Sequence, residues 1–365
     1  MKAALMATAL LALANSNARA QSVSIYGLLD TGVEYVSHVG AAGAGLKRMP
    51  GQTGAMPSRL GFRGSEDLGD GLSAVFVLEQ GLLADGGVLG QGGRAFGRMA
   101  HVGLSSKRWG TLSFGRQYTM LFWSLLNADI LGPGIYSSSS LDSYIPNARA
   151  DNSIAYRGTF SGLTVGATFS LGRDAVNAGP SPAGTNCAGE RASDARACRE
   201  WSALLKYDAA TWGLAIAVDE LRGGPGAFGG LTASALSDRR VSANGYYKVS
   251  STTLAGGVIR RRNEGSAATS RSDLWYLGVT QSLTGALTLD AELFRLSFKG
   301  SGNKATLGAL RLSYLLSKRS QVYATAGHIA NDGSLALSVS AGAPGSNPAA
   351  GAAQSGVMLG VRHSF

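Results

Sequence analysis

The segment "GVMLGVRHSF", residues 356–365, ends the chain with two kinds of side chain in strict alternation. In an extended strand, one face carries Val357, Leu359, Val361, His363 and Phe365, and the other carries Met358, Gly360, Arg362 and Ser364. Chain ends are usually polar and unpaired. A strand that continues to a final aromatic residue therefore predicts a partner that leaves no edge free, and "SVSIYG" (22–27) is the candidate.

The same period of two recurs along the chain. In "SRLGFRG" (58–64), Leu60 and Phe62 lie opposite Arg59 and Arg63. Such alternation is typical of half-buried strands. In "ALTLDAELFRLSF" (286–298) the apolar face changes parity before Leu296, which indicates either a β-bulge or a weakly patterned strand.

The segments between the strands fall into two classes of length. Tight turns are expected near 66–70, 106–109, 158–161, 208–211, 249–252, 283–286 and 317–319. Longer polar stretches cover about 38–57, 81–96, 117–150, 173–199, 222–237, 263–271 and 332–353, with a shorter connection near 300–303. Short and long connections that alternate in this way predict about 16 antiparallel strands, with both termini on the side of the tight turns.

This pattern meets a physical requirement of the membrane interior. A sheet survives in hydrocarbon only when it is closed, with apolar side chains outside and polar side chains inside. The chain has 52 glycines, only 9 prolines and no mature run of 18 apolar residues. We therefore predict an all-β fold, a transmembrane antiparallel β-barrel. A soluble β-sandwich would also alternate, but its loops would not sort by length.

The N-terminal segment "MKAALMATALLALANSNARA" (1–20) has the features of a secretory signal peptide. It has one early lysine, an apolar run and a small-x-small cleavage site, so the predicted mature barrel domain covers 21–365. A buried first helix is the alternative. Removing Lys2 and Arg19 lowers the formal net charge from +10 to +8. A basic surface suits nucleic acid, anionic surfaces or anionic solutes, and export argues against nucleic acid.

Two cysteines, Cys187 and Cys198, lie in a polar stretch. In an oxidising compartment such a pair is expected to form a disulfide that pins a loop. Metal binding is the alternative, but no histidine lies near them. No metal or other cofactor is expected.

Several longer segments resemble the trimeric general diffusion porins of Gram-negative outer membranes. They are "SVSIYGLLDTGVEY" (22–35), "SRLGFRGSEDLGDGLSAVFVLE" (58–79), "RMAHVGLSSKRWGTLSFGRQYT" (98–119), "DNSIAYRGTFSGLTVGATFS" (151–170) and "LGVRHSF" (359–365). The resemblance implies a 16-stranded barrel, a homotrimer, and a third long loop that folds inward to narrow a pore. It also implies contact with outer-membrane lipid and lipopolysaccharide.

The third loop corresponds to residues 117–150, where "TMLFWSLL" (119–126) suits a short helix against the barrel wall. Alternatively, Phe122 and Trp123 anchor a surface loop. The Pro-Glu-Phe-Gly-Gly-like motif of many family members is absent here. The loop acids are Asp129 and Asp142, and the sequence leaves open which of them faces the pore.

Basic residues are expected on the opposite wall of the pore. By local resemblance the candidates are Arg59, Arg98 and Arg149, with Arg63, Arg116 and Arg157 as further candidates. Rings of Arg or Lys favour anions. The sequence therefore predicts an anion-preferring channel for ions and small hydrophilic solutes.

Other functions find less support in the sequence. The chain has no Gly-x-Ser-x-Gly or His-Glu-x-x-His motif, so no enzymatic activity is expected. A substrate-selective channel would need a binding track, for which "YSSSS" (136–140) and Tyr144 are candidates. An adhesin or receptor barrel with a closed lumen is the remaining alternative.

Overall fold

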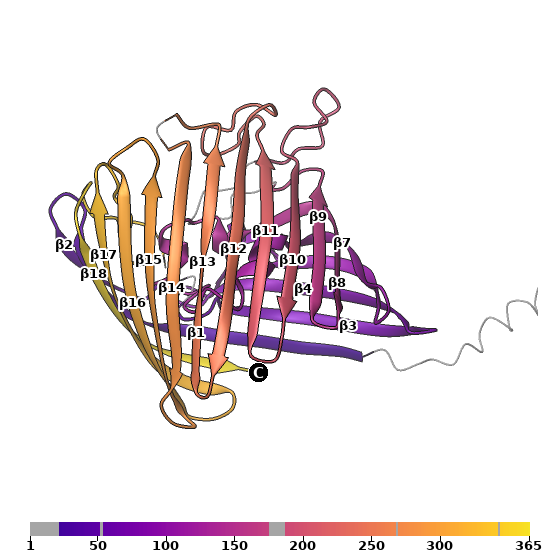
Figure 1. The fold of residues 1–365 in the computed structure, drawn as a ribbon, viewed down its shortest axis with the longest axis horizontal. Helices are drawn as coiled ribbons and strands as arrows, with labels where there is room; N and C mark the ends of the chain where they lie inside the picture. Colours follow the sequence, from indigo (N-terminus) through magenta and orange to yellow (C-terminus); the bar gives the residue numbers. More distant parts are fainter. Residues whose placement is uncertain (1–21, 52–53, 175–186, 268, 342–343) are drawn as a thin grey trace, which may run out of the picture.

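The computed structural model describes residues 22–51, 54–174, 187–267, 269–341 and 344–365. Within these ranges the chain forms an antiparallel sheet that closes on itself (Figure 1). The segment predicted to be a signal peptide, residues 1–20, lies outside the described residues. No helix in the described ranges is long and apolar enough to cross a membrane.

Sixteen strands of the described chain build the barrel wall. They are β1 (Ser22–Val39), β3 (Arg59–Gly69), β4 (Leu72–Leu83), β6 (Met99–Ser106), β7 (Gly110–Tyr118), β8 (Arg149–Phe160), β9 (Leu163–Ser170), β10 (Glu200–Asp208), β11 (Trp212–Arg222), β12 (Ser237–Val249), β13 (Thr252–Asn263), β14 (Arg271–Ser282), β15 (Leu287–Phe298), β16 (Lys304–Leu315), β17 (Ser320–Asp332) and β18 (Gln354–Ser364). Two short segments, β2 (Ala44–Arg48) and β5 (Val88–Leu89), extend β1 and β4 within the long loops.

Within the part of the chain that the structure describes, four short helical segments lie in the loops. They are α2 (Gly90–Gly93), α3 (Met120–Leu125), η2 (Ser138–Ser140) and η3 (Ile145–Asn147).

The two classes of connection lie at opposite ends of the barrel (Figure 1). Each predicted tight turn joins two strands, and each predicted long stretch forms a connection at the other end. Two of the tight turns, Asp70–Gly71 and Ser161–Gly162, place both residues at positive φ. Such turns match the twist of a hairpin, which is why glycine occupies their second position.

The barrel closes where the C-terminal strand meets the first one. β18 pairs with β1 from Leu28↔Ser364 to Val36↔Gly356. Gly27 and Phe365 then exchange two backbone hydrogen bonds, each of 3.1 Å. The predicted closure of the last strand on the first strand is confirmed, but the pairing lies further along β1 than "SVSIYG" (22–27). Of that segment only Gly27 bonds the end of the last strand, and residues 22–28 pair with β3 instead.

The outer face of the wall is apolar, as the period of two predicts. Along β1, Ile25 and Val33 are exposed while Asp30 and Glu34 on the alternate face are buried. The interpretation of β15 needs a correction, because its register against both neighbours has no bulge. Leu296 instead points inward and is buried, with the third loop packed into the barrel on that side.

Candidate functional site

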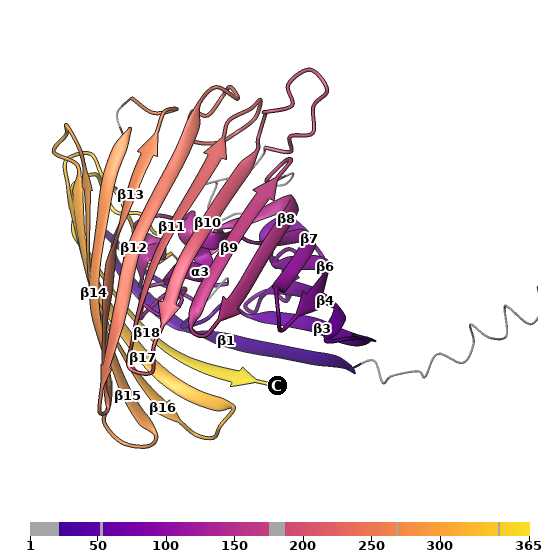
Figure 2. The same cartoon turned by 45° about the vertical axis from the view of Figure 1, so that its right-hand side comes forward.

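The connection between β7 and β8, residues 119–148, folds into the barrel and is called loop 3 here. Its first segment, α3, lies against β10 and β11 (Figure 2). The residues of α3 that are spaced one turn apart, Met120 with Ser124 and Leu121 with Leu125, are buried. This apolar face holds the helix to the inner wall.

Polar groups on the inner wall accept hydrogen bonds from loop 3 along its path. The backbone N–H that begins α3 donates to Ser202 Oγ on β10 (2.9 Å). The N–H of Leu131 donates to Glu292 on β15 (2.8 Å), and the Tyr136 hydroxyl donates to Glu34 on β1 (2.8 Å). Loop 3 is therefore fixed at widely separated points around the wall.

The last part of loop 3 is held by charged groups of β10 to β12. The Tyr144 hydroxyl lies 2.7 Å from Glu200 Oε1 and 3.1 Å from Asp219 Oδ1. Asp142 forms an ion pair with Arg240 at 2.7 Å. Arg240 is fully buried, so this pair is shielded from water.

Three of the predicted arginines meet on the wall formed by β3, β4, β7 and β8. Arg98 and Arg149 both donate to the Tyr118 hydroxyl, at 2.7 and 2.6 Å. Glu79 lies 2.6 Å from Arg98 and 3.7 Å from Arg59. We call Arg59, Arg98 and Arg149 the arginine cluster. Glu79 pairs with two of the three guanidinium groups and is the carboxylate of the cluster, so the cluster carries net positive charge.

Loop 3 lies directly against this cluster. The Tyr118 ring stacks on Phe122 of α3, with ring centroids 3.8 Å apart. The guanidinium of Arg149 lies 4.4 Å from the centre of the same Tyr118 ring. The aromatic pair therefore sets the distance between α3 and the arginine cluster.

Acidic and basic side chains of the inner wall differ in their access to water. Eight of the inward carboxylates are each less than one-tenth exposed: Asp30, Glu34, Glu79, Glu200, Asp219, Asp238, Asp290 and Glu292. The side chain of Asp208 is more exposed, at 32%, and is paired with Lys206. The partly or fully exposed inward cations include Arg59, Arg157, Arg311 and Arg362. Because the carboxylates are covered by loops or by arginines, most of the inward charge in contact with water in this part of the barrel is positive.

The other predicted arginines lie apart from the cluster. Arg157 stacks on Trp123 of α3, with its guanidinium carbon 3.6 Å from the ring centre. Arg63 lies over the Tyr26 ring at 5.3 Å. Arg116 forms a 2.7 Å ion pair with Asp151 and does not join the cluster.

Neither acid of loop 3 presents a free charge to the lumen. Asp129 accepts hydrogen bonds from the Gly132 N–H (2.9 Å) and the Ser138 hydroxyl, and burial raises its pKa. Burial also acts to raise the pKa of Asp142, but Arg240 outweighs it and holds that pKa below its ordinary value. Both acids hold the loop in place.

Several residues at the site were missed by sequence reasoning. Tyr118 and Glu79 organise the arginine cluster, and Arg311 and Arg362 contribute inward charge. Arg311 and Arg362 could have been found by parity, since each alternates with exposed apolar neighbours on its strand. Tyr118 follows a register shift in β7, so parity could not have placed it.

A second loop, residues 333–353, also folds over loop 3. The Ser140 hydroxyl donates to the Val339 carbonyl (3.0 Å), and the Ala341 N–H donates to the Ile135 carbonyl (2.9 Å). Val339 is fully buried. The sequence of this loop, which is rich in small and polar residues, did not predict that the loop folds inward.

Cys187 and Cys198 form a disulfide in the connection between β9 and β10, with Cα atoms 5.1 Å apart. Both residues are buried, and Ala197 packs with them. The bond ties two segments of that connection together.

The barrel, the inward loop and the charged wall define a channel of the outer-membrane β-barrel class. A family model for Gram-negative porins matches residues 3–334, and the chain belongs to this family. The outer membrane of a Gram-negative bacterium is accordingly its location.

Individual proteins support the same placement. Outer membrane porin protein 32 of Delftia acidovorans is 28% identical, with 100% of both chains covered. An outer membrane porin of Bordetella pertussis is 37% identical over 198 residues, which cover 48% of this chain and 51% of that relative. The anion-selective porin from Comamonas acidovorans has the same fold, with a TM-score of 0.75 at 23% identity, over 95% of this chain and 100% of that one.

Proposed function

We propose that the protein forms a water-filled channel through which ions and small hydrophilic solutes diffuse across the outer membrane, with anions preferred. The observation that carries the preference is the difference in burial between inward acids and inward arginines. A unit charge about 4 Å from a passing ion contributes roughly 1 kcal/mol in bulk water and about 4 kcal/mol at an effective dielectric of 20. About 1.4 kcal/mol is a tenfold preference, so a few exposed arginines suffice.

The test is a reversal potential measured in a planar bilayer under a salt gradient. We expect the wild-type potential to indicate anion preference, and Arg59→Gln to reduce it. Arg59 is the right first target because it is partly exposed, whereas Arg98 and Arg149 are buried and their loss would leave Tyr118 and Glu79 short of partners. Lys107→Gln, in an exposed tight turn, is the charge-matched control. Cation preference in the wild type would refute the proposal.

The triple variant of Arg59, Arg98 and Arg149 to Gln extends this test to the whole arginine cluster. Its folding is checked first by heat-resistant mobility in detergent. A folded triple variant should lose part of the anion preference while conducting ions, because Arg157, Arg311 and Arg362 remain in contact with water.

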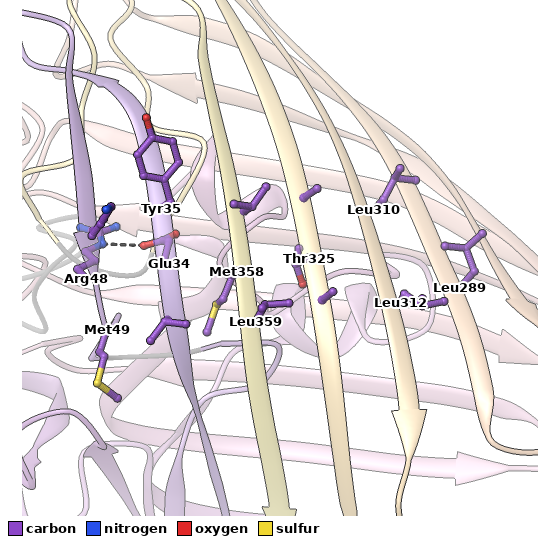
Figure 3. A pocket seen from close by; sticks show the side chains of 15 residues that line it. Glu34, Tyr35, Arg48, Met49, Leu289, Leu310, Leu312, Thr325, Met358 and Leu359 are labelled. Atoms are coloured by element: carbon purple, nitrogen blue, oxygen red, sulfur yellow. Dashed lines mark hydrogen bonds and ion pairs between the residues drawn. The ribbon is translucent and has the colours of Figure 1, made fainter.

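We also propose that the protein assembles as a homotrimer. The outward residues of β1 and β18 include no Asp, Glu, Lys or Arg. An apolar hollow of about 990 Å³ lies on this wall, with Leu310, Leu312 and Leu359 among its lining residues (Figure 3). A second copy of the chain would cover this surface. Native mass spectrometry in detergent should show the mass of three subunits. For Leu359→Glu it should show the mass of a single subunit.

The alternatives receive less support. Ser137, Ser139 and Ser140 direct their hydroxyls to backbone carbonyls of loop 3 or of the loop above it, so they do not form a free sugar-binding track. We propose a channel without enzymatic activity, and lipase and peptidase assays on the purified protein test this. Stepwise conductance distinguishes the channel from an occluded adhesin.

A further inference from the structure

The accessible side of loop 3 presents apolar side chains inside the barrel (Figure 2). Leu126 is 47% exposed, and Phe122, Pro133 and Pro146 are partly exposed. These four residues line one shallow hollow of about 20 Å³, which is completed by Leu125, Asp129, Gly132 and Ile145. Asp129 brings no free charge to this lining, because its oxygens accept hydrogen bonds from loop 3 itself. The hollow is therefore an open apolar surface that suits one side of a solute.

Arg157 of β8 lies beside this surface with its guanidinium carbon 3.6 Å from the centre of the Trp123 ring. In register it lies between Thr111 of β7 and Gly166 of β9, which carry no charge. Arg157 is exposed, and no carboxylate or other acceptor of the described residues takes a hydrogen bond from it. A guanidinium stacked on a ring keeps its N–H groups in its own plane, where they can engage both oxygens of a carboxylate. The Trp123 ring thus orients an arginine whose donors are free.

The acid on the same strand as Arg157 is engaged by other arginines. Asp151 forms ion pairs with Arg94 at 3.0 Å and with Arg116 at 2.7 Å. Its side chain is 15% exposed. Asp151 therefore does not neutralise Arg157.

A second acid, Asp208 at the end of β10, lies near the exposed end of α3. Asn127, which follows Leu126, donates to Asp208 Oδ1 at 3.3 Å. The Asp208 carboxylate is paired with Lys206 at 3.1 Å and also accepts a hydrogen bond from the Tyr246 hydroxyl at 3.0 Å. Because Lys206 balances the charge of Asp208, the excess charge beside Leu126 is that of Arg157.

The free arginine and the apolar surface belong to one face of the helical turn. Trp123, on which Arg157 stacks, precedes Leu126 by three residues, and Phe122 precedes it by four. Leu126 has helical φ and ψ of −54° and −29°, so the spacing of the helix extends to it. Residues three or four apart on a helix are neighbours, with about 5–6 Å between their Cβ atoms. The stacked guanidinium therefore lies about one helical turn from an exposed leucine.

The two features together fit one class of solute. An inorganic anion can use Arg157 but gains nothing from the apolar side chains. An uncharged aromatic molecule can use the apolar side chains but not the arginine. A small carboxylate that carries an aromatic ring can use both at once.

We propose that Arg157, Leu126 and Phe122 form a weak binding site for small aromatic carboxylates, with the carboxylate on Arg157 and the ring against Leu126 and Phe122. The proposal rests on the proposed function, because it names a class of anion that the channel conducts preferentially. A site in a channel must bind strongly enough to draw the solute in and weakly enough to release it. An open surface beside one free arginine meets both conditions.

The experiment measures how far benzoate reduces the chloride current of the mature protein in a planar bilayer at neutral pH and constant ionic strength. A benzoate bound at Leu126 obstructs the lumen that loop 3 narrows. Acetate has the same charge without the ring, and benzamide has the ring without the charge. We expect benzoate to halve the chloride current at a concentration several-fold lower than either of them.

Substitutions separate the two contacts. Arg157→Gln should raise the half-blocking concentration of benzoate about tenfold, as expected for the loss of a charge-assisted hydrogen bond. Leu126→Ser keeps the charge of the site and should bring the half-blocking concentration of benzoate close to that of acetate. Leu126→Met keeps the surface apolar, so benzoate should block this variant as it blocks the wild type.

Matched controls lie in exposed tight turns, away from the lumen. Lys107→Gln removes a positive charge there, and Leu283→Ser removes an exposed leucine. Benzoate should block both controls as it blocks the wild type. The folding of every variant is checked by heat-resistant mobility in detergent, and the comparison of the three solutes on the wild type needs no variant at all.

The results distinguish this site from the proposed function. If benzoate blocked the wild type no better than acetate or benzamide does, the inference would be overturned. It would also be overturned if benzoate blocked folded Leu126→Ser as strongly as the wild type. The reversal potential in potassium chloride, measured on the same channels, tests the proposed anion preference separately. Chloride preference without an effect of the benzoate ring would remove the site alone, whereas a wild type without chloride preference would remove the proposed preference.

Discussion

Asp142 illustrates how one side chain holds loop 3 in its inward position. Its carboxylate pairs with the fully buried Arg240, which also contacts Asp238 at 3.1 Å. Removing one member of a buried ion pair typically costs about 3–5 kcal/mol. Since Asp238 remains as a partner, we expect Asp142→Asn to cost up to about 3 kcal/mol. Asp142→Asn should therefore unfold at a lower temperature than the wild type and should show larger open-channel noise.

The control for this prediction is Asp332→Asn. Asp332 is exposed at the end of β17 and its carboxylate has no ion-pair partner within the described ranges. Asp332→Asn should leave the unfolding temperature and the open-channel noise unchanged. Equal noise in both variants would show that the Asp142–Arg240 pair does not restrain loop 3.

The same pair predicts a pH dependence of channel noise. Burial acts to raise the pKa of Asp142, but Arg240 and Arg261 more than compensate, so this pKa lies below its ordinary value. The stabilisation is therefore fully present above the unfolded pKa of about 3.9, and it is lost as pH falls through the folded value. The difference in noise between Asp142→Asn and the wild type should therefore be constant from neutral pH to about 5 and should shrink below about 4. Comparing the two proteins at each pH isolates this pair from Asp129, whose pKa burial raises.

At the scale of elements, β15 joins the barrel wall to loop 3 through its inward face. Phe294 is fully buried, and its ring centre lies 6.3 Å from that of Tyr276. Phe294→Ala leaves a cavity that should cost about 3–5 kcal/mol. Leu293→Ala, one residue earlier on the lipid-facing side, should cost much less. The heat resistance of the folded band in detergent is compared between Phe294→Ala and Leu293→Ala. If both variants lost heat resistance equally, Phe294 would not hold loop 3.

β15 also marks where sequence reasoning ends. Period-two alternation predicted the strands and the two classes of connection, because one face of each strand meets lipid along its whole length. The inward face meets water in one place and a packed loop in another. Leu296 lies in a buried cluster that includes residues of loop 3, and local parity cannot report packing with residues more than a hundred positions away.

Prediction from the sequence was limited in the same way at the arginine cluster. The resemblance pointed to Arg59, Arg98 and Arg149, but the residues that join them, Tyr118 and Glu79, come from β7 and β4. Arg98 precedes β6 by one residue, so its direction is set by its bond to Glu79 and not by strand parity. Only the closed barrel brings these groups together.

The closure between β18 and β1 provides a second test at this scale. The Phe365 ring lies against the Cα of Gly27, where an added Cβ would overlap ring atoms. Gly27→Val should therefore displace the ring and weaken the last hydrogen bonds of the closure. We expect the proposed trimer of Gly27→Val to dissociate in detergent at a lower temperature than that of the wild type. Gly300→Val is unsuitable as a control because Gly300 has positive φ, whereas Gly308→Val is suitable, since Gly308 has open space and no positive φ.

On the scale of the whole molecule, the inward carboxylates and the inward arginines have different roles. Inner-wall carboxylates such as Glu34, Glu200 and Glu292 accept hydrogen bonds from loop 3 and are buried by it. The loop that narrows the lumen thereby covers negative charge on the wall that holds it. Arg59, Arg157, Arg311 and Arg362 stay in contact with water. In the channel that we propose, constriction and anion preference therefore arise from the same packing.

This arrangement predicts how the anion preference responds to salt. If it comes from water-exposed charges such as Arg59 and Arg157, mobile ions screen it. The Debye length falls from about 10 Å at 0.1 M salt to about 3 Å at 1 M. The anion-to-cation permeability ratio, measured from reversal potentials at a fixed salt gradient ratio, should therefore decline steadily over that range. The triple variant of Arg59, Arg98 and Arg149 should start at a lower ratio and decline less with salt, because Arg157, Arg311 and Arg362 remain in contact with water. A wild-type ratio that is independent of salt would instead mean that anions are selected by desolvated contacts within a dry site, and the charge of the wall would lose its role.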